Sequence, residues 1–200
     1  MTLVDESNGA FGVAVRSAYA GEKGDLKKRL VRDLRGVFAR VEIADVSSSD
    51  LDDIGVPARL EARFSAKKLA TPEAGGSTLR LVFDALGIER VATEPPDARR
   101  FDLVLDRPYA HDVTIRYHLP AGARVASVPP RVEVRAPGLL SYVQEVRETD
   151  DGAEVHRRFE LEQRRITHAD YAAFRDALRE IEVAEQRTLR VTSGAAGEGR

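Results

Sequence analysis

Cysteine is absent from the 200 residues of this chain, and so is tryptophan. Without a thiol the chain has no cysteine nucleophile, no disulfide and no zinc site that uses a cysteine ligand. Enzymes with a cysteine nucleophile, thiol-based redox switches and zinc fingers with cysteine ligands are thereby excluded by composition.

An excess of charge of either sign is also lacking. The 31 Lys and Arg residues nearly balance the 33 Asp and Glu residues, and the formal net charge is -2. A chain with this balance generates no net field that would concentrate nucleic acid or anionic lipid. We therefore expect no nucleic-acid partner.

Long apolar runs are missing as well. No run reaches the roughly 18 residues that a membrane-spanning helix needs, so we expect no direct membrane insertion. The first residues, 1–6, lack the basic start and apolar stretch of a signal peptide. On these grounds the sequence predicts neither export nor anchoring by its own N-terminus.

What the chain does contain is an ordinary globular composition, with 42% hydrophobic and 32% charged residues. A chain of this length has enough residues to bury a sizeable core. We predict a prelude over residues 1–50, a larger antiparallel domain over 51–192 and a disordered small-residue tail over 193–200.

The prelude is predicted to be a strand, a helix and a strand. Phe11, Val13 and Val15 alternate, which indicates a strand over residues 10–20. From Asp25, the expected N-cap, the period changes to that of an amphipathic helix, and a second strand is expected over 41–46. The apolar positions that carry the helix prediction are Leu26, Leu30, Leu34, Val37 and Phe38.

Short alternating runs continue after Pro57 and predict half-buried antiparallel strands. Residues 67–76 and 84–100 are expected to be loops. The strongest signal is a hairpin, whose arms run over 140–147 and 155–163 around Asp150-Asp151-Gly152. Arg157 falls on the inward face of its arm. The remaining strand predictions rest on alternating apolar positions near residues 60–64, 79–83, 101–105, 113–119, 125 and 132–134.

Near the C-terminus the sequence predicts a helix over 168–186, followed by a strand over 188–191. Thr167 and Asp170 are spaced as a capping box, and Ile166 and Tyr171 as a hydrophobic staple. The fold class is therefore α+β, predominantly antiparallel β and sandwich-like, with one N-terminal and one C-terminal amphipathic helix.

Candidates for catalysis are few. His111 and Asp112 are neighbours on an expected strand and should point to opposite faces. His118 and His156 lie on the polar faces of expected strands, where a solvated side chain is expected. His168 lies in the first turn of the predicted C-terminal helix, beside its N-cap. We therefore predict no catalytic, cofactor-binding or metal-ligating residue.

Other motifs also favour structural interpretations. Ser65-Ala66-Lys67-Lys68 matches S-x-x-K, but its partner motifs are missing and it ends a strand. The acidic run near Asp50 lacks the spacing of a calcium loop, and Gly75-Gly76 lacks a phosphate-loop pattern. The arginines at 157, 158, 164 and 165 alternate with glutamates, which indicates pairing between strands.

Three local patterns and the order of elements carry a family resemblance. The first is Asn8-Gly9 with the segment leading to Asp25. The second is Arg100-Phe101-Asp102-Leu103, followed by Leu119-Pro120-Ala121-Gly122-Ala123-Arg124-Val125 and Val128-Pro129. The third is the ending, from Ile166 through Tyr171-Ala172-Ala173-Phe174-Arg175 to Leu189-Arg190-Val191. Together they resemble the β-rich domain of unknown function that follows the catalytic core in bacterial transglutaminase-like proteins of the DUF3857 type.

The resemblance implies an accessory role. A transglutaminase-like core uses a cysteine activated by a histidine, and this chain has no cysteine, so no catalytic residue carries over. The resemblance implies a non-catalytic interaction domain, packed against a transglutaminase-like core in the same or another polypeptide. It also implies a fragment of a longer protein and a periplasmic or envelope location.

Two alternatives stay open. One is a stand-alone ligand- or carbohydrate-binding β-sandwich, although most of the aromatic residues fall at inward positions. The other is a hydrolase whose groups meet only in three dimensions, for example His111 or His118 with Asp106 or Asp112.

Overall fold

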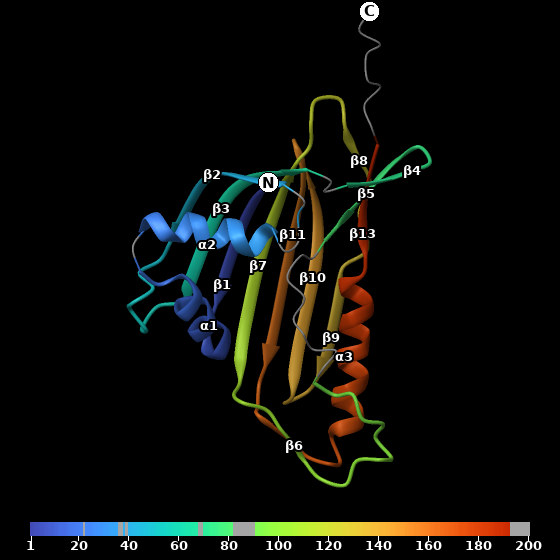
Figure 1. The fold of residues 1–200 in the computed structure, drawn as a ribbon. Helices are drawn as coiled ribbons and strands as arrows, with labels where there is room; N and C mark the ends of the chain where they lie inside the picture. Colours follow the sequence, from blue (N-terminus) through green and yellow to red (C-terminus); the bar gives the residue numbers. More distant parts are fainter. Residues whose placement is uncertain (22, 36–37, 39, 68–69, 82–90, 193–200) are drawn as a thin grey trace, which may run out of the picture.

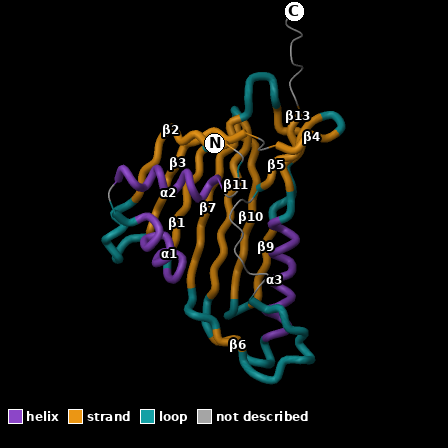
Figure 2. The backbone as a smooth tube through the Cα atoms, in the orientation of Figure 1, coloured by secondary structure: helices purple, strands orange, loops and turns teal. Residues whose placement is uncertain are grey.

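Within the residues that the structure describes, three antiparallel sheets and three helices make up the fold (Figures 1 and 2). The computed structural model describes residues 1–21, 23–35, 38, 40–67, 70–81 and 91–192. The predicted tail over 193–200 and parts of the predicted strand over 79–83 and loop over 84–100 lie outside these residues. The predominantly antiparallel α+β class is confirmed.

The largest sheet has seven strands. From one edge to the other they are β2 (Arg40–Ser48), β3 (Ala58–Lys67), β1 (Thr2–Ser7), β7 (Tyr109–His118), β11 (Gly152–Leu161), β10 (Leu140–Thr149) and β9 (Val132–Ala136). β1 lies in the middle of this order, between β3 and β7. Strands from both sides of the predicted boundary at residue 50 therefore share one sheet.

The smaller elements complete the fold. The four-stranded sheet has the order β4 (Ala70–Glu73), β5 (Gly76–Arg80), β13 (Thr188–Thr192) and β8 (Arg124–Ser127), and the two-stranded sheet pairs β6 (Leu103–Val104) with β12 (Arg165–Ile166). The helices are α1 (Gly9–Tyr19), α2 (Lys23–Arg35) and α3 (Tyr171–Glu185).

Side chains of the large sheet alternate between a covered face and an open face, as period-2 strands require. Along β7, for example, Val113, Ile115 and Tyr117 are buried while Arg116 and His118 are exposed. In the described part of the chain the three helices and the four-stranded sheet all lie over the covered face (Figure 1). The open face carries charged residues.

The covered face has three neighbouring parts. α1 and α2 lie over the side of the sheet that holds β2, β3 and β1, and the four-stranded sheet packs apolar side chains onto β7, β11 and β10. α3 packs onto β9 and β10 with six buried residues. Those residues are Tyr171, Phe174, Ala177, Leu178, Ile181 and Ala184.

Several sequence predictions are confirmed. The hairpin forms between β10 and β11, and a Cβ on Gly152 would lie 1.9 Å from the Tyr117 carbonyl oxygen of β7, so only glycine fits there. Helix α2 and strands β2, β3, β7, β9 and β13 also lie where the apolar periodicity places them. The N-cap predicted at Asp25 is wrong, because α2 begins at Lys23 and Asp25 lies in its first turn.

The predicted strand over residues 10–20 is wrong, because this segment is helix α1. Phe11, Val15 and Tyr19 are four residues apart and face the protein, whereas Val13 is 53% exposed. Alternation at only three positions, 11, 13 and 15, fits a helix with one exposed apolar residue equally well. The first strand is instead β1, which was not predicted.

Smaller corrections follow from local geometry. The predicted loop over 67–76 contains strand β4, and β6 has only two residues, so Phe101 lies outside any strand. Helix α3 begins at Tyr171 rather than at residue 168. The Asp170 amide donates to Thr167 Oγ1 at 3.2 Å, but the Asp170 carboxylate accepts from the Thr167 hydroxyl at 2.7 Å instead of from its amide.

Candidate functional site

Three of the four histidines pair with an aspartate. His111 Nε2 lies 3.2 Å from Asp5 Oδ1, His118 Nδ1 lies 2.5 Å from Asp151 Oδ2, and His156 Nε2 lies 2.9 Å from Asp112 Oδ1. In every pair the partners come from different strands or turns. The pairings considered from sequence, of His111 or His118 with Asp106 or Asp112, are not among the hydrogen bonds that the structure describes.

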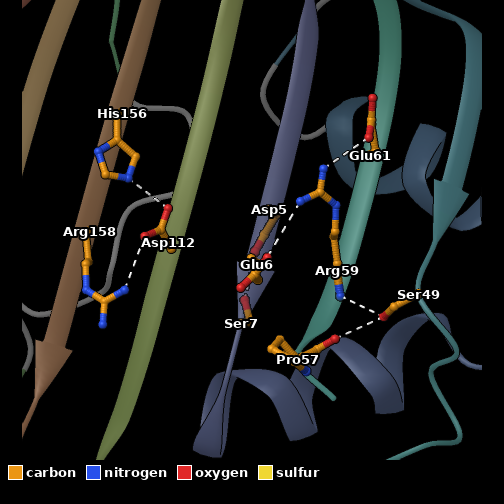
Figure 3. Close-up of polar contacts among 10 residues, drawn as sticks. All are labelled: Asp5, Glu6, Ser7, Ser49, Pro57, Arg59, Glu61, Asp112, His156 and Arg158. Atoms are coloured by element: carbon orange, nitrogen blue, oxygen red, sulfur yellow. Dashed lines mark hydrogen bonds and ion pairs between the residues drawn. The ribbon is translucent and has the colours of Figure 1, made fainter.

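The His156 pair belongs to the open face of the large sheet. Asp112 of β7 lies between His156 and Arg158 of β11, and Arg158 Nη1 is 3.4 Å from Asp112 Oδ2 (Figure 3). The hydrogen bond to Asp112 raises the pKa of His156, although partial burial opposes the shift. Burial favours a higher pKa for Asp112, but the bonds from His156 and Arg158 outweigh it and lower the pKa.

Further ion pairs cover the same open face. Arg59 lies 3.6 Å from Glu6 of β1 and 3.3 Å from Glu61 of β3 (Figure 3), and Arg116 lies 2.5 Å from Glu154. Of the arginine-rich segment, Arg158 makes the expected pairing between strands, with Asp112 of β7, and it also pairs with Glu160 on its own strand. Exposed pairs of this kind neutralise each other and are typical of a solvated face.

Arg157 is different, because it points into the core. It is 2% exposed, and its Nη1 donates to Glu185 Oε1 of α3 at 2.9 Å. Arg157 therefore has the inward position that the sequence predicted, and its side chain links the end of α3 to β11. Burial and the nearby charge of Glu185 also raise the pKa of Tyr109 to about 12.

Asp5, Ser7 and His111 form a buried cluster on the covered face. β1 pairs with β7 so that Ser7 lies opposite His111, and the Ser7 hydroxyl donates to Asp5 Oδ1 at 2.7 Å. The His111 ring stacks on Phe11 of α1, with ring centroids 4.5 Å apart. Ser7 is fully buried, and its hydroxyl donates its hydrogen bond to the Asp5 carboxylate. The cluster therefore orients Asp5 and presents no nucleophile to a substrate.

A pocket of about 230 Å³ adjoins this cluster, between α2 and the large sheet. Its wall is mostly apolar, and the polar side chains in it are Asp5, Tyr19 and Asp33. Met1, whose N-terminal ammonium donates to the Phe64 carbonyl at 2.7 Å, also lines it. The Tyr19 hydroxyl donates to Asp33 Oδ2 at 2.7 Å. The pocket unites β1, α1, α2 and β3 with β7, which comes much later in the sequence, and no local motif indicated it.

A second feature lies at the end of the sheet where β6 is drawn (Figure 1). The segment of residues 91–108, which we call the clamp loop, is held through Arg99. This guanidinium lies 4.6 Å from the ring centroid of Tyr171 in α3, donates to the Phe101 carbonyl at 2.9 Å, and pairs with Glu94 at 2.9 Å.

Asp102 fixes the clamp loop from the other side. Its carboxylate accepts from Arg165 Nε and from the His168 amide, each at 2.8 Å, and these bonds lower the pKa of Asp102. His168 Nε2 also lies 2.8 Å from the Arg99 carbonyl oxygen. His168 is therefore a clamp residue, a role that its position beside a helix cap did not reveal.

Phe101 sits in the middle of this network and is 80% exposed. The sequence placed it on the inward side of an alternating run with Leu103 and Leu105, and this prediction is wrong. Val104 of β6 is 56% exposed. A well-anchored loop thus displays a large aromatic side chain to solvent, together with the exposed Val104 of the same loop.

The remaining sequence motifs have structural roles. Ser65 lies in β3, paired with β2, while Lys68 is outside the described residues. Asp50 and Asp53 each accept a backbone amide two residues ahead, as in ordinary polar turns, and Gly75 lies in the β4–β5 turn. Across the described ranges, no three His, Asp or Glu side chains converge as metal ligands. None of the described helices has the length and apolar character to cross a membrane.

Comparison with known proteins gives one match. The family described as "Domain of Unknown Function with solved-structure structure (DUF3858)" matches residues 80–191, more than half of the chain and the part that contains β6 to β12 and α3. No curated protein and no solved structure matches the chain. The β-rich domain of unknown function expected from the sequence is therefore found, and the chain belongs to the DUF3858 family.

Proposed function

We propose that the chain is a non-catalytic interaction domain that docks onto a transglutaminase-like catalytic core through Phe101. The observation that supports this is the exposure of Phe101 on a loop fixed by Arg99, Asp102 and His168. The partner follows from the resemblance of the sequence to the domain after such a core.

Anchoring matters for binding. A side chain on a mobile loop loses conformational freedom when a partner immobilises it, and this loss weakens the complex. The clamp loop has already been ordered by folding, so burying Phe101 costs less entropy. Aromatic side chains in this situation tend to dominate the binding energy of an interface.

A catalytic role has little support beside this proposal. The chain has no cysteine, and Ser7 is buried with its hydroxyl bonded to Asp5. The other histidine pairs lie among exposed ion pairs. We assign the chain a binding function and place the chemistry on the partner.

The test is site-specific photo-crosslinking in the cells from which the protein comes. A photoreactive phenylalanine analogue replaces Phe101 in one variant and Val183 in the control, which is 63% exposed on α3. We expect position 101 to crosslink to a transglutaminase-like domain, in the same or another polypeptide, and position 183 to give no such product. Equal crosslinking from both positions, or none from 101, would overturn the proposal.

Once the partner is identified, Phe101→Ala gives a quantitative check. We expect the affinity for the isolated core to fall at least about tenfold, which corresponds to roughly 1.4 kcal/mol. Val183→Ala should leave the affinity unchanged. An unchanged affinity for the Phe101 variant would show that another surface makes the contact.

A further inference from the structure

We propose that the pocket between α2 and the large sheet is a binding site for a small hydrophobic amine, which is held by its charged ammonium group at Asp5. This site is separate from the clamp loop. It is formed by different elements from those that hold Phe101, so the two proposals can fail independently.

The size of the pocket fits a compact apolar body. Its volume of about 230 Å³ exceeds the roughly 150 Å³ of an engineered apolar cavity that takes up benzene. The apolar part of the wall comes from both the helix and the strands beneath it. Its residues include Leu3, Leu30, Leu34, Ala62, Phe64 and Ile115.

The polar groups of the pocket favour a positive charge. Asp5 and Asp33 are both carboxylates, and Tyr19 already donates its proton to Asp33. A mostly apolar pocket with a few convergent polar groups is the usual form of a small-molecule site. Asp33 already accepts from Arg32, and the Met1 ammonium donates to the Phe64 carbonyl, so Asp5 is the carboxylate that can hold an ammonium group.

Asp5 is the group best placed to receive the ligand. Its Oδ1 accepts from both Ser7 and His111, which fixes the orientation of the carboxylate. Within the described residues, no hydrogen bond to Oδ2 is present, and the side chain is 21% exposed. One oxygen is therefore held in place and the other can still accept a proton donor.

The electrostatic environment agrees with this geometry. The pKa of Tyr19 is raised, first by burial, then by its hydrogen bond to Asp33 and by the charges of Asp33 and Asp5. The charges of Asp33 and Asp5 contribute to this shift, although the charge of Arg32 opposes it, and these two carboxylates would also attract an ammonium group.

The experiment uses three probes of equal chain length, hexylamine, hexanol and hexanoate, added to the full chain at neutral pH. Methyl NMR signals of Leu30, Leu34 and Leu60 report on the pocket. We expect these signals to shift with hexylamine, and hexylamine to bind at least tenfold more tightly than hexanoate, with hexanol between them.

Two neighbouring residues of β1 provide a matched pair of variants. Asp5→Asn removes the charge that faces the pocket, and Glu6→Gln removes a charge from the opposite face of the same strand. We expect Asp5→Asn to weaken hexylamine binding at least tenfold and to leave hexanol binding within twofold. Glu6→Gln should change neither.

A third variant tests the location without altering charge. Ala62→Leu places additional carbon atoms in the pocket and should abolish binding of all three probes while the chain stays folded. Three results would each overturn the proposal: no shift of the pocket methyl signals, equal affinity for hexanoate and hexylamine, or equal losses from Asp5→Asn and Glu6→Gln.

Discussion

Helices α2 and α3 cover the same face of the same sheet, yet they close it to different degrees. α3 buries six side chains against β9 and β10. α2 buries Leu26, Leu30 and Leu34, and a pocket of about 230 Å³ remains beneath it. Both helices are amphipathic, so amphipathicity alone does not determine whether a core is sealed.

The difference lies in what each helix meets. α3 faces large side chains, such as Tyr142 and Phe159, and Arg157 pairs with Glu185 near its C-terminal end. α2 meets Phe64 as well, but Ala62 on the same face of β3 is small and leaves space between helix and sheet, and Asp5 on β1 keeps a carboxylate there. A sealed core stabilises the fold, whereas an incompletely filled one can hold a ligand.

The largest effect is expected from truncation under α3. Ile181 is fully buried, and Ile181→Ala should lower the free energy of unfolding by about 4 kcal/mol, through lost burial and a new cavity. Leu34→Ala, beside the existing pocket, should cost only about 2 kcal/mol, because Leu34 already borders empty space. Denaturant titration of both variants measures the difference. Equal losses would show that the two regions are packed alike.

The buried ion pair should come next. Arg157→Ala leaves the carboxylate of Glu185, which is 12% exposed, without this cation, and we expect a loss of about 3 kcal/mol. Arg147→Ala on the open face is the control, because its pair with Glu145 is exposed and worth less than about 1 kcal/mol. A loss from Arg157→Ala no larger than that of the control would contradict a structural role for the pair.

Enlarging a small residue should have opposite results in the two regions. Ala177→Leu inserts volume between α3 and the sheet and should destabilise the chain by about 2 kcal/mol through overpacking. Ala62→Leu extends into the pocket and should be neutral or stabilising. Thermal unfolding followed by circular dichroism compares them. Similar destabilisation by both would mean that the pocket has no usable space.

The smallest effect concerns the open face. The raised pKa of His156 means that its pair with Asp112 stabilises the fold fully below about pH 6.5, the unfolded-state value. This contribution is lost as the pH rises through the folded-state pKa. The lowered pKa of Asp112 means that its contribution is lost in acid.

We therefore expect His156→Gln to be destabilising between about pH 4.5 and 6, by less than about 1 kcal/mol because both side chains are partly exposed. The effect should shrink at pH 8. Denaturant titrations at several pH values test this, and a cost that grows towards pH 8 would refute the assignment.

The sequence predicts those parts of the fold in which a pattern is long or a turn is specific. The β10–β11 hairpin combines ten-residue strands with a tight turn at Asp150-Asp151, and α2 and α3 repeat their apolar residues over several turns. α1 was missed because three alternating residues do not distinguish a strand from a helix.

The candidate sites could not be predicted, because they depend on contacts between distant residues. Asp5 and His111 are 106 positions apart, and Asp102 and His168 are 66 apart. Nothing in either local sequence specifies such a partner. The exposure of Phe101 likewise depends on β6 being only two residues long, which the alternation around it did not show.

The most direct test of the contrast between the two helices is xenon binding observed by methyl NMR. Xenon enters apolar cavities without requiring a specific contact, so it reports empty space alone. We predict shifts of the Leu30, Leu34 and Leu60 methyl signals beneath α2, and none at Leu178 and Ile181 beneath α3. Shifts in both regions, or shifts confined to the α3 side, would contradict the account.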